Sequence, residues 1–202
     1  VEGVDIDPSS VIAAKSVLNR FCPDGPWKVQ ELSVFDLLGK CLNSYDIVHS
    51  WGVLHHTGAM WQAIDASCRL VAPQGLLCIA LYRKTPLCRF WKAEKWLYTN
   101  GPFWLQRLIR RIFKIIFVLG LLITGRNPRH YFDEYKIARG MDWHHDVHDW
   151  LGGYPYESVT PAKVLKFISD RGFVLERCFQ KPAIAFGLFG SHCDEFVARK
   201  VN

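Results

Sequence analysis

The first part of the chain alternates short apolar runs with segments whose apolar positions recur at helical spacing. Four runs predict strands and two segments predict helices: strands at 1–6, 29–35, 46–50 and 76–82, helices at 8–21 and 59–71. Asp7 stands where a helix N-cap belongs, and Pro8 follows in the first turn, where proline is tolerated. Apolar strands that alternate with helices are typical of a parallel sheet covered on both faces.

The rest of the chain departs from this rhythm and then returns to it. Residues 83–157 contain a long helical segment over 87–124, interrupted at Gly101-Pro102, and then an aromatic, histidine-rich stretch. Beyond it, strands are expected at 173–179 and 195–200, and their short link favours an antiparallel hairpin. We therefore expect one domain over residues 1–202, with 83–157 inserted as a cap over the carboxyl edge of the sheet, where such folds bind ligands.

Composition narrows the classes of protein that fit this pattern. The 202 residues are 50% hydrophobic and 22% charged, as in a globular domain with a sizeable core. A net charge of +6 permits an anionic partner but requires none, and no specific nucleic acid is expected. The seven cysteines form no C-x-x-C pair, which argues against a zinc site and favours reduced thiols in the cytoplasm. We expect no signal peptide and no membrane span.

Two loops that follow predicted strands carry the candidate chemistry. Asp5 ends the first strand, where an acid can accept hydrogen bonds from both hydroxyls of a ribose, and the alternative is an N-cap acid that binds no ligand. The third strand runs into Ser50-Trp51-Gly52-Val53-Leu54-His55-His56. Either imidazole could hold or deprotonate a substrate hydroxyl. The alternative, preferred for His55, is a ring that only fills the loop or caps the next helix.

Taken in order, these segments resemble the class I S-adenosylmethionine-dependent methyltransferases that act on small molecules. The likeness continues through residues 69–77, where Gln74 stands in place of a usual glycine. It implies a Rossmann-like α/β sheet, parallel except for an antiparallel last strand, and methyl transfer from S-adenosylmethionine to a small-molecule acceptor, with oxygen as the first guess for the methylated atom. The implied cofactor residues are Asp5 at the ribose, with Ile6, Ser33, Val34 and Ser50 around the rest of the cofactor.

The resemblance also implies residues for the acceptor. It makes His56 the catalytic residue, with Trp51 and His55 beside the acceptor. Residues 139–157 resemble a signature of one subgroup, from which we expect Trp143, His145, Asp146 and Tyr154 to close the far side. Two alternatives exist for this stretch, a purely structural corner and a metal site built from its histidines and aspartates. We favour a hydrogen-bonded acceptor pocket without a metal.

Two features leave room for other functions. The family places a first strand and a glycine-rich loop before the segment that opens this chain, so an incomplete, inactive methyltransferase-like fragment is one alternative. In the inserted segment, Arg107, Arg110, Arg111 and Lys114 share one side of an otherwise apolar helix. Such a helix can lie on an anionic membrane and serve a lipid-linked acceptor, or it can be a lid with a solvated basic face, which we favour.

Overall fold

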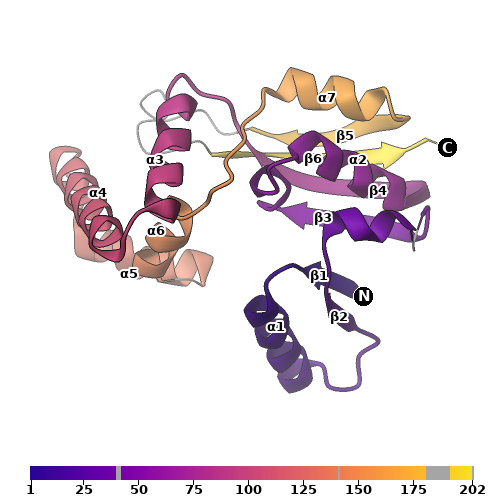
Figure 1. Cartoon of the computed structure of the whole chain (residues 1–202), viewed down its shortest axis with the longest axis horizontal. Helices are drawn as coiled ribbons and strands as arrows, with labels where there is room; N and C mark the ends of the chain where they lie inside the picture. The colour runs from indigo at the N-terminus through magenta and orange to yellow at the C-terminus, as the bar shows by residue number, and fades with distance from the viewer. Residues whose placement is uncertain (40–41, 141, 181–191, 202) are drawn as a thin grey trace.

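The computed structural model describes residues 1–39, 42–140, 142–180 and 192–201. Its centre is a four-stranded sheet in the order β3-β4-β6-β5, and a second sheet pairs β1 with β2 (Figure 1). The bounds are β1 (Glu2–Asp5), β2 (Lys28–Glu31), β3 (Tyr45–Trp51), β4 (Val71–Tyr82), β5 (Phe173–Phe179) and β6 (Cys193–Lys200). β1 with β2 and β3 with β4 are parallel pairs, whereas β6 is antiparallel to both of its neighbours.

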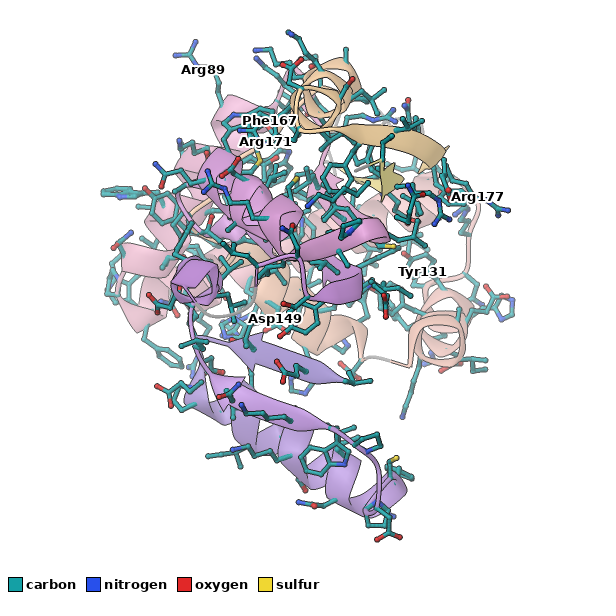
Figure 2. The ribbon with its side chains drawn as sticks, turned by 90° about the vertical axis from the view of Figure 1, so that its right-hand side faces the viewer. Arg89, Tyr131, Asp149, Phe167, Arg171 and Arg177 are labelled. Carbon is teal, nitrogen blue, oxygen red and sulfur yellow. The ribbon has the colours of Figure 1, made fainter. Side chains whose placement is uncertain are left out.

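Two layers follow from this pairing. The helices α2 (Met60–Leu70) and α7 (Pro161–Ser169) pack on the main sheet, and their Ile64 and Val164 share a buried core with Leu77, Ile79 and Phe196 of the strands. The helix α1 (Pro8–Phe21) packs on β1 and β2, and Figure 2 shows these three elements as a separate layer below the main sheet. The Tyr45 phenol donates a hydrogen bond to the Glu2 carboxylate, which joins the amino ends of β1 and β3.

A group of helices lies beyond the carboxyl ends of β3 and β4 (Figure 1). It contains α3 (Cys88–Asn100), α4 (Phe103–Ile123), α5 (Pro128–Arg139) and α6 (Trp143–Leu151), and we call it the cap. The cap has an apolar core of its own, built around Tyr98, Trp143, Val147 and Leu151. Because this core is separate from that of the sheet, the cap holds its shape largely through its own aromatic packing.

Local signals in the sequence placed most boundaries correctly. The Asp7 carboxylate accepts hydrogen bonds from the backbone N–H groups of Ser9 and Ser10, so its expected role as the cap of α1 is confirmed. The antiparallel pairing of β5 with β6 is also confirmed, while most of the predicted link between them, residues 181–191, lies outside the described residues. The α/β sheet with an antiparallel last strand therefore agrees with the sequence analysis.

One predicted strand ends earlier than expected. β2 stops at Glu31, and a short 3-10 helix, η1 (Val34–Gly39), replaces the rest of the strand predicted over residues 29–35. The Ser33 hydroxyl accepts a hydrogen bond from the backbone N–H of Phe35, and this local bond offers the backbone an alternative to the sheet. Among the described residues, no helix is long and apolar enough to cross a membrane.

Candidate functional site

The loop after β3 forms the centre of the candidate site. It continues into a short 3-10 helix, η2 (Leu54–His56), which places two consecutive imidazoles next to the end of β4. The ring of His55 is fully buried, its Nδ1 accepts a hydrogen bond from the backbone N–H of Tyr82, and its centroid lies 3.9 Å from that of the Tyr82 ring. Burial lowers the pKa of His55 to about 3, so this ring is neutral and belongs to the core.

His56 is held in a different way. Its Nδ1 lies 2.7 Å from the carbonyl oxygen of Pro155, a residue 99 positions further along the chain. A carbonyl can only accept, so Nδ1 carries the proton and Nε2 keeps the lone pair. Burial lowers the pKa of His56, against an opposing effect of the Pro155 carbonyl, which leaves the ring neutral near pH 7. Its tautomer is the one that a proton acceptor needs at Nε2.

The segment that follows α6 lies close against the His56 ring. A side chain at Gly153 would begin 2.8 Å from Cε1 of His56, so only glycine allows the backbone to approach so closely. Glu157 makes two hydrogen bonds to the neighbouring elements. Its backbone N–H donates to the His55 carbonyl of η2, and its carboxylate accepts from the backbone N–H of Met60, the first residue of α2. The second bond caps α2, whose own N-cap residue Ala59 offers no side-chain acceptor.

A buried lysine of the cap lies close to the segment that holds His56. The Lys95 side chain is fully buried, its ammonium group donates to the Trp150 carbonyl, and it stands 3.6 Å from the centroid of the Trp150 ring. Burial lowers the pKa of Lys95, and its charge contributes to lowering the pKa values of His55 and His56. Beside it, burial raises the pKa of Glu94, whose two carboxylate oxygens have no hydrogen-bond partner among the described residues.

The predicted cofactor residues lie at strand ends and are more open. Asp5 is exposed at the end of β1, and its Oδ1 accepts a hydrogen bond from the N–H of Asp7. Ile6 follows with 73% of its surface exposed. Val34 packs against the core at the start of η1, and Ser50 is half-buried near the end of β3. Their assignment to S-adenosylmethionine stays a prediction.

The structure separates the predicted acceptor residues into two groups. Trp51 is exposed at the end of β3, and Tyr154 is half-buried between Gly153 and Pro155, next to His56 in the chain segment that binds it. Trp143 is buried in the core of the cap, and Asp146 accepts a hydrogen bond from the Tyr135 phenol of α5. His145 is exposed in the first turn of α6. The residues on α6 thus serve cap packing or face solvent in this conformation.

Sequence reasoning missed three members of the site, Tyr82, Lys95 and Tyr156. Tyr82 ends β4 and its ring lies 5.3 Å from those of both His56 and Tyr156. A signal existed for Lys95, because Trp91, Lys95 and Tyr98 recur at helical spacing on the buried side of α3. A lysine in an apolar row of this kind indicates a buried cation. No comparable signal marks the other two.

The surroundings of the site hold a shallow hollow. The hollow, about 390 Å³ in volume, is lined by Arg89, Lys92, Ala93, Trp96 and Tyr154, and Figure 2 shows Arg89 extending away from the body of the molecule. A larger polar hollow lies at the other end of the sheet, beside Arg171 and Asp65, which form an ion pair. Within the described ranges, no group of three or more potential ligands could hold a metal ion.

Comparison with solved structures identifies proteins of the same fold. No protein-family model and no curated protein matches the sequence. Among solved structures, an S-adenosylmethionine-dependent methyltransferase of Methanosarcina mazei is 14% identical with a TM-score of 0.53, and the match covers 100% of this chain and 82% of that one. Magnesium protoporphyrin IX methyltransferase of Synechocystis, solved with bound S-adenosylhomocysteine, is 17% identical with a TM-score of 0.50 over 99% of this chain and 63% of that one.

A third match is the 1,6-didemethyltoxoflavin N1-methyltransferase of Burkholderia thailandensis, solved with its substrate and S-adenosylhomocysteine. It is 13% identical with a TM-score of 0.51, over 100% of this chain and 61% of that one. The chain therefore spans less than two thirds of the length of the Synechocystis and Burkholderia enzymes. At these identities the likeness establishes the fold, which is that of the class I methyltransferases.

Proposed function

We propose that this chain transfers a methyl group from S-adenosylmethionine to a small-molecule acceptor, with an oxygen atom as the acceptor. The observation that carries the proposal is the neutral His56 ring, which ends η2 and is fixed by the Pro155 carbonyl. Structures of the same fold that contain S-adenosylhomocysteine support the choice of cofactor. In this fold class, ligands bind at the carboxyl edge of the sheet, and η2 follows the carboxyl end of β3.

The residues at the strand ends suit the nucleoside part of that cofactor. Asp5 is an exposed carboxylate and can accept from two ribose hydroxyls. The exposed side chain of Ile6 offers an apolar surface to the adenine, with Ser33 and Val34 at its edge and Ser50 toward the methionine end. When bound, the cofactor supplies a methyl group on a sulfonium, which needs an attacking atom held in line.

His56 would act on the acceptor. With its proton on Nδ1, it could take the proton of an acceptor hydroxyl at Nε2 as that oxygen displaces sulfur from the methyl carbon, which would leave S-adenosylhomocysteine as the second product. Trp51 and Tyr154 would contact the acceptor from two sides. For the other predicted acceptor residues we propose supporting roles: buried His55 orients the loop, and Trp143, His145 and Asp146 belong to the helix that precedes Tyr154.

Two further points complete the proposal. Cys22, Cys68 and Cys178 are free thiols, and we place the protein in the cytoplasm, where thiols stay reduced. A lipid-linked acceptor is the second candidate, favoured by the exposed apolar side of α4, which carries Trp104 and Ile115.

Calorimetry with S-adenosylhomocysteine tests the proposal directly. We expect the 202-residue chain to bind this product with a dissociation constant in the micromolar to low millimolar range, at one site per chain. Adenosine is the matched probe for the strand-end residues, and it should compete. No heat of binding at millimolar ligand would overturn the proposal for this chain and favour the inactive methyltransferase-like alternative.

A further inference from the structure

The long helix α4 presents an apolar surface to solvent. Its 21 residues extend over about 31 Å at the usual rise of 1.5 Å per residue. Trp104, Ile115 and Ile123 expose 67%, 59% and 86% of their surfaces. We define the outer face of α4 as the exposed apolar residues on the side away from the cap: Trp104, Leu108, Ile112, Ile115, Leu119, Leu122 and Ile123.

The apolar side chains on the opposite side of the same helix are already packed within the cap. Ile109, Phe113 and Phe117 pack against the core of the cap, and Leu121 is buried. A surface helix of a globular protein is apolar toward the core and polar toward solvent. In α4 both directions are apolar, so the outer face exceeds what folding of the cap requires. Figure 1 places α4 at the periphery of the molecule. Surfaces of this kind mark sites of interaction.

The charged residues of α4 indicate which kind of partner covers the outer face. The helix contains four basic residues and no acidic one. Arg107 and Arg111 border the outer face, whereas Arg110 and Lys114 are half-buried nearer the cap, where the Lys114 ammonium lies 5.8 Å from the centroid of the Trp143 ring. Arg107 and Arg111 are exposed, and the Arg107 guanidinium lies over the Phe103 ring at 4.8 Å. An apolar strip with arginines along one edge and Trp104 near one end matches the boundary between headgroups and acyl chains.

We propose that the outer face of α4 binds the surface of an anionic lipid bilayer, with the helix axis in the plane of the membrane. A second copy of the chain fits less well, because pairing two outer faces would bring the same arginines together, and each chain has a net charge of +6. A bilayer supplies both missing complements, an apolar layer for Ile115 and its neighbours and negative charge for Arg107 and Arg111.

This inference differs from the sequence-based preference for a lid with a solvated basic face. The structure shows that the face turned to solvent is apolar and that the basic residues occupy only its edge. The inference rests on α4 alone and holds whether or not the chain transfers methyl groups. Calorimetry with S-adenosylhomocysteine in the absence of lipid and binding to vesicles can therefore succeed or fail independently.

Flotation with vesicles provides the test. The full chain is mixed with vesicles of phosphatidylcholine alone or with one quarter phosphatidylglycerol, at low and high salt. We expect flotation with the anionic vesicles that weakens as salt rises. The variant Ile115→Asn with Leu119→Asn should lower the partition coefficient at least tenfold. The variant Arg107→Gln with Arg111→Gln should lower it about 25-fold on anionic vesicles, since each cation near such a surface contributes about a factor of five, and should have little effect on neutral ones.

A matched control distinguishes binding through the outer face from nonspecific binding through any exposed apolar residue. Ile137 of α5 exposes 85% of its surface outside the outer face, and Ile137→Asn should leave flotation unchanged. All substituted positions are exposed. Circular dichroism of each variant is the check that it folds. Absence of flotation at low salt would overturn the proposal. So would a concentration-dependent dimer, measured by light scattering, that Ile115→Asn with Leu119→Asn dissolves, because this result would assign the outer face to a second copy.

Discussion

The two sides of the candidate site differ in how the fold holds them. On the acceptor side, His56 is fixed by Pro155 and enclosed by Gly153, and Glu157 ties the same segment to α2. On the cofactor side, Asp5 and Ile6 stand exposed at the end of β1. The first side is organised by contacts within the chain, whereas the second offers its groups to solvent. Substitutions on the acceptor side should therefore lower stability, and those of Asp5 and Ile6 should lower affinity alone.

The largest effect is expected for His56→Ala. The substitution removes a half-buried ring and leaves the Pro155 carbonyl without its donor, so the free energy of unfolding should fall by about 3 kcal/mol. Urea unfolding followed by circular dichroism measures it. His144, exposed on α6, is the matched control, and His144→Ala should stay within about 0.5 kcal/mol of the original. Equal losses in both variants would contradict a preorganised acceptor side.

Gly153→Ala tests the close approach of the backbone to the same ring. The new Cβ would lie 2.8 Å from Cε1 of His56, so the ring or the segment must move, at a cost of about 2 kcal/mol. The control is Gly3→Ala in β1, where the nearest atom to a new Cβ would be 3.8 Å away. Thermal unfolding compares the two. An unchanged midpoint for Gly153→Ala would show that the segment adapts freely.

Acid should weaken the acceptor side through His55. Its pKa of about 3 in the folded chain lies below the value near 6.5 of an unfolded histidine, so the unfolded state binds the proton first. The resulting stability is present above pH 6.5 and is lost as pH falls, by about 2 kcal/mol between pH 6.5 and 5.0. His55→Asn should abolish this part of the pH dependence, whereas His130→Asn, at an exposed position of α5, should retain it. Parallel pH profiles for the original chain and His55→Asn would refute this origin.

On the cofactor side, two neighbouring aspartates should behave in opposite ways. Asp5→Ala should weaken binding of S-adenosylhomocysteine about tenfold and leave the unfolding midpoint unchanged, because Asp5 is exposed. Asp7→Ala should retain the affinity and lower the stability of α1 by about 1 kcal/mol, because Asp7 caps that helix. Calorimetry and thermal unfolding of both variants provide the comparison. A reversed pattern would assign the ribose site to Asp7.

The smallest effect concerns Glu157. Removal of its carboxylate in Glu157→Ala should cost about 1 kcal/mol, because the N-terminus of α2 loses the acceptor for the Met60 N–H. Glu157→Gln keeps an oxygen there and should recover most of the loss. Glu134→Ala, on the exposed side of α5, is the control for loss of a negative charge. If Glu157→Gln were as unstable as Glu157→Ala, charge and not the hydrogen bond would account for the effect.

Several features were decided by the sequence itself, since they depend on neighbours in the chain. The Asp7 carboxylate reaches N–H groups two and three residues away, and the break at Gly101-Pro102 separates α3 from α4 as predicted. Apolar runs of the right length also predicted the strands, although the Ser33 hydroxyl ended β2 early and β4 begins at Val71, five residues before the predicted start. Such signals act through local hydrogen bonds and periodicity, which are visible in a single sequence.

The tertiary structure alone decided which side chains meet. The contact between His56 and Pro155 joins residues 99 positions apart, and no local pattern predicts that Gly153 must leave room for the ring. The same holds for α4, which is apolar on two sides, so that its sequence could not tell which side packs on the cap. Burial is a property of the assembled chain, because it depends on which surfaces the other elements cover. The sequence thus determined the elements and their chemistry, and the packing determined which groups are fixed and which face outward.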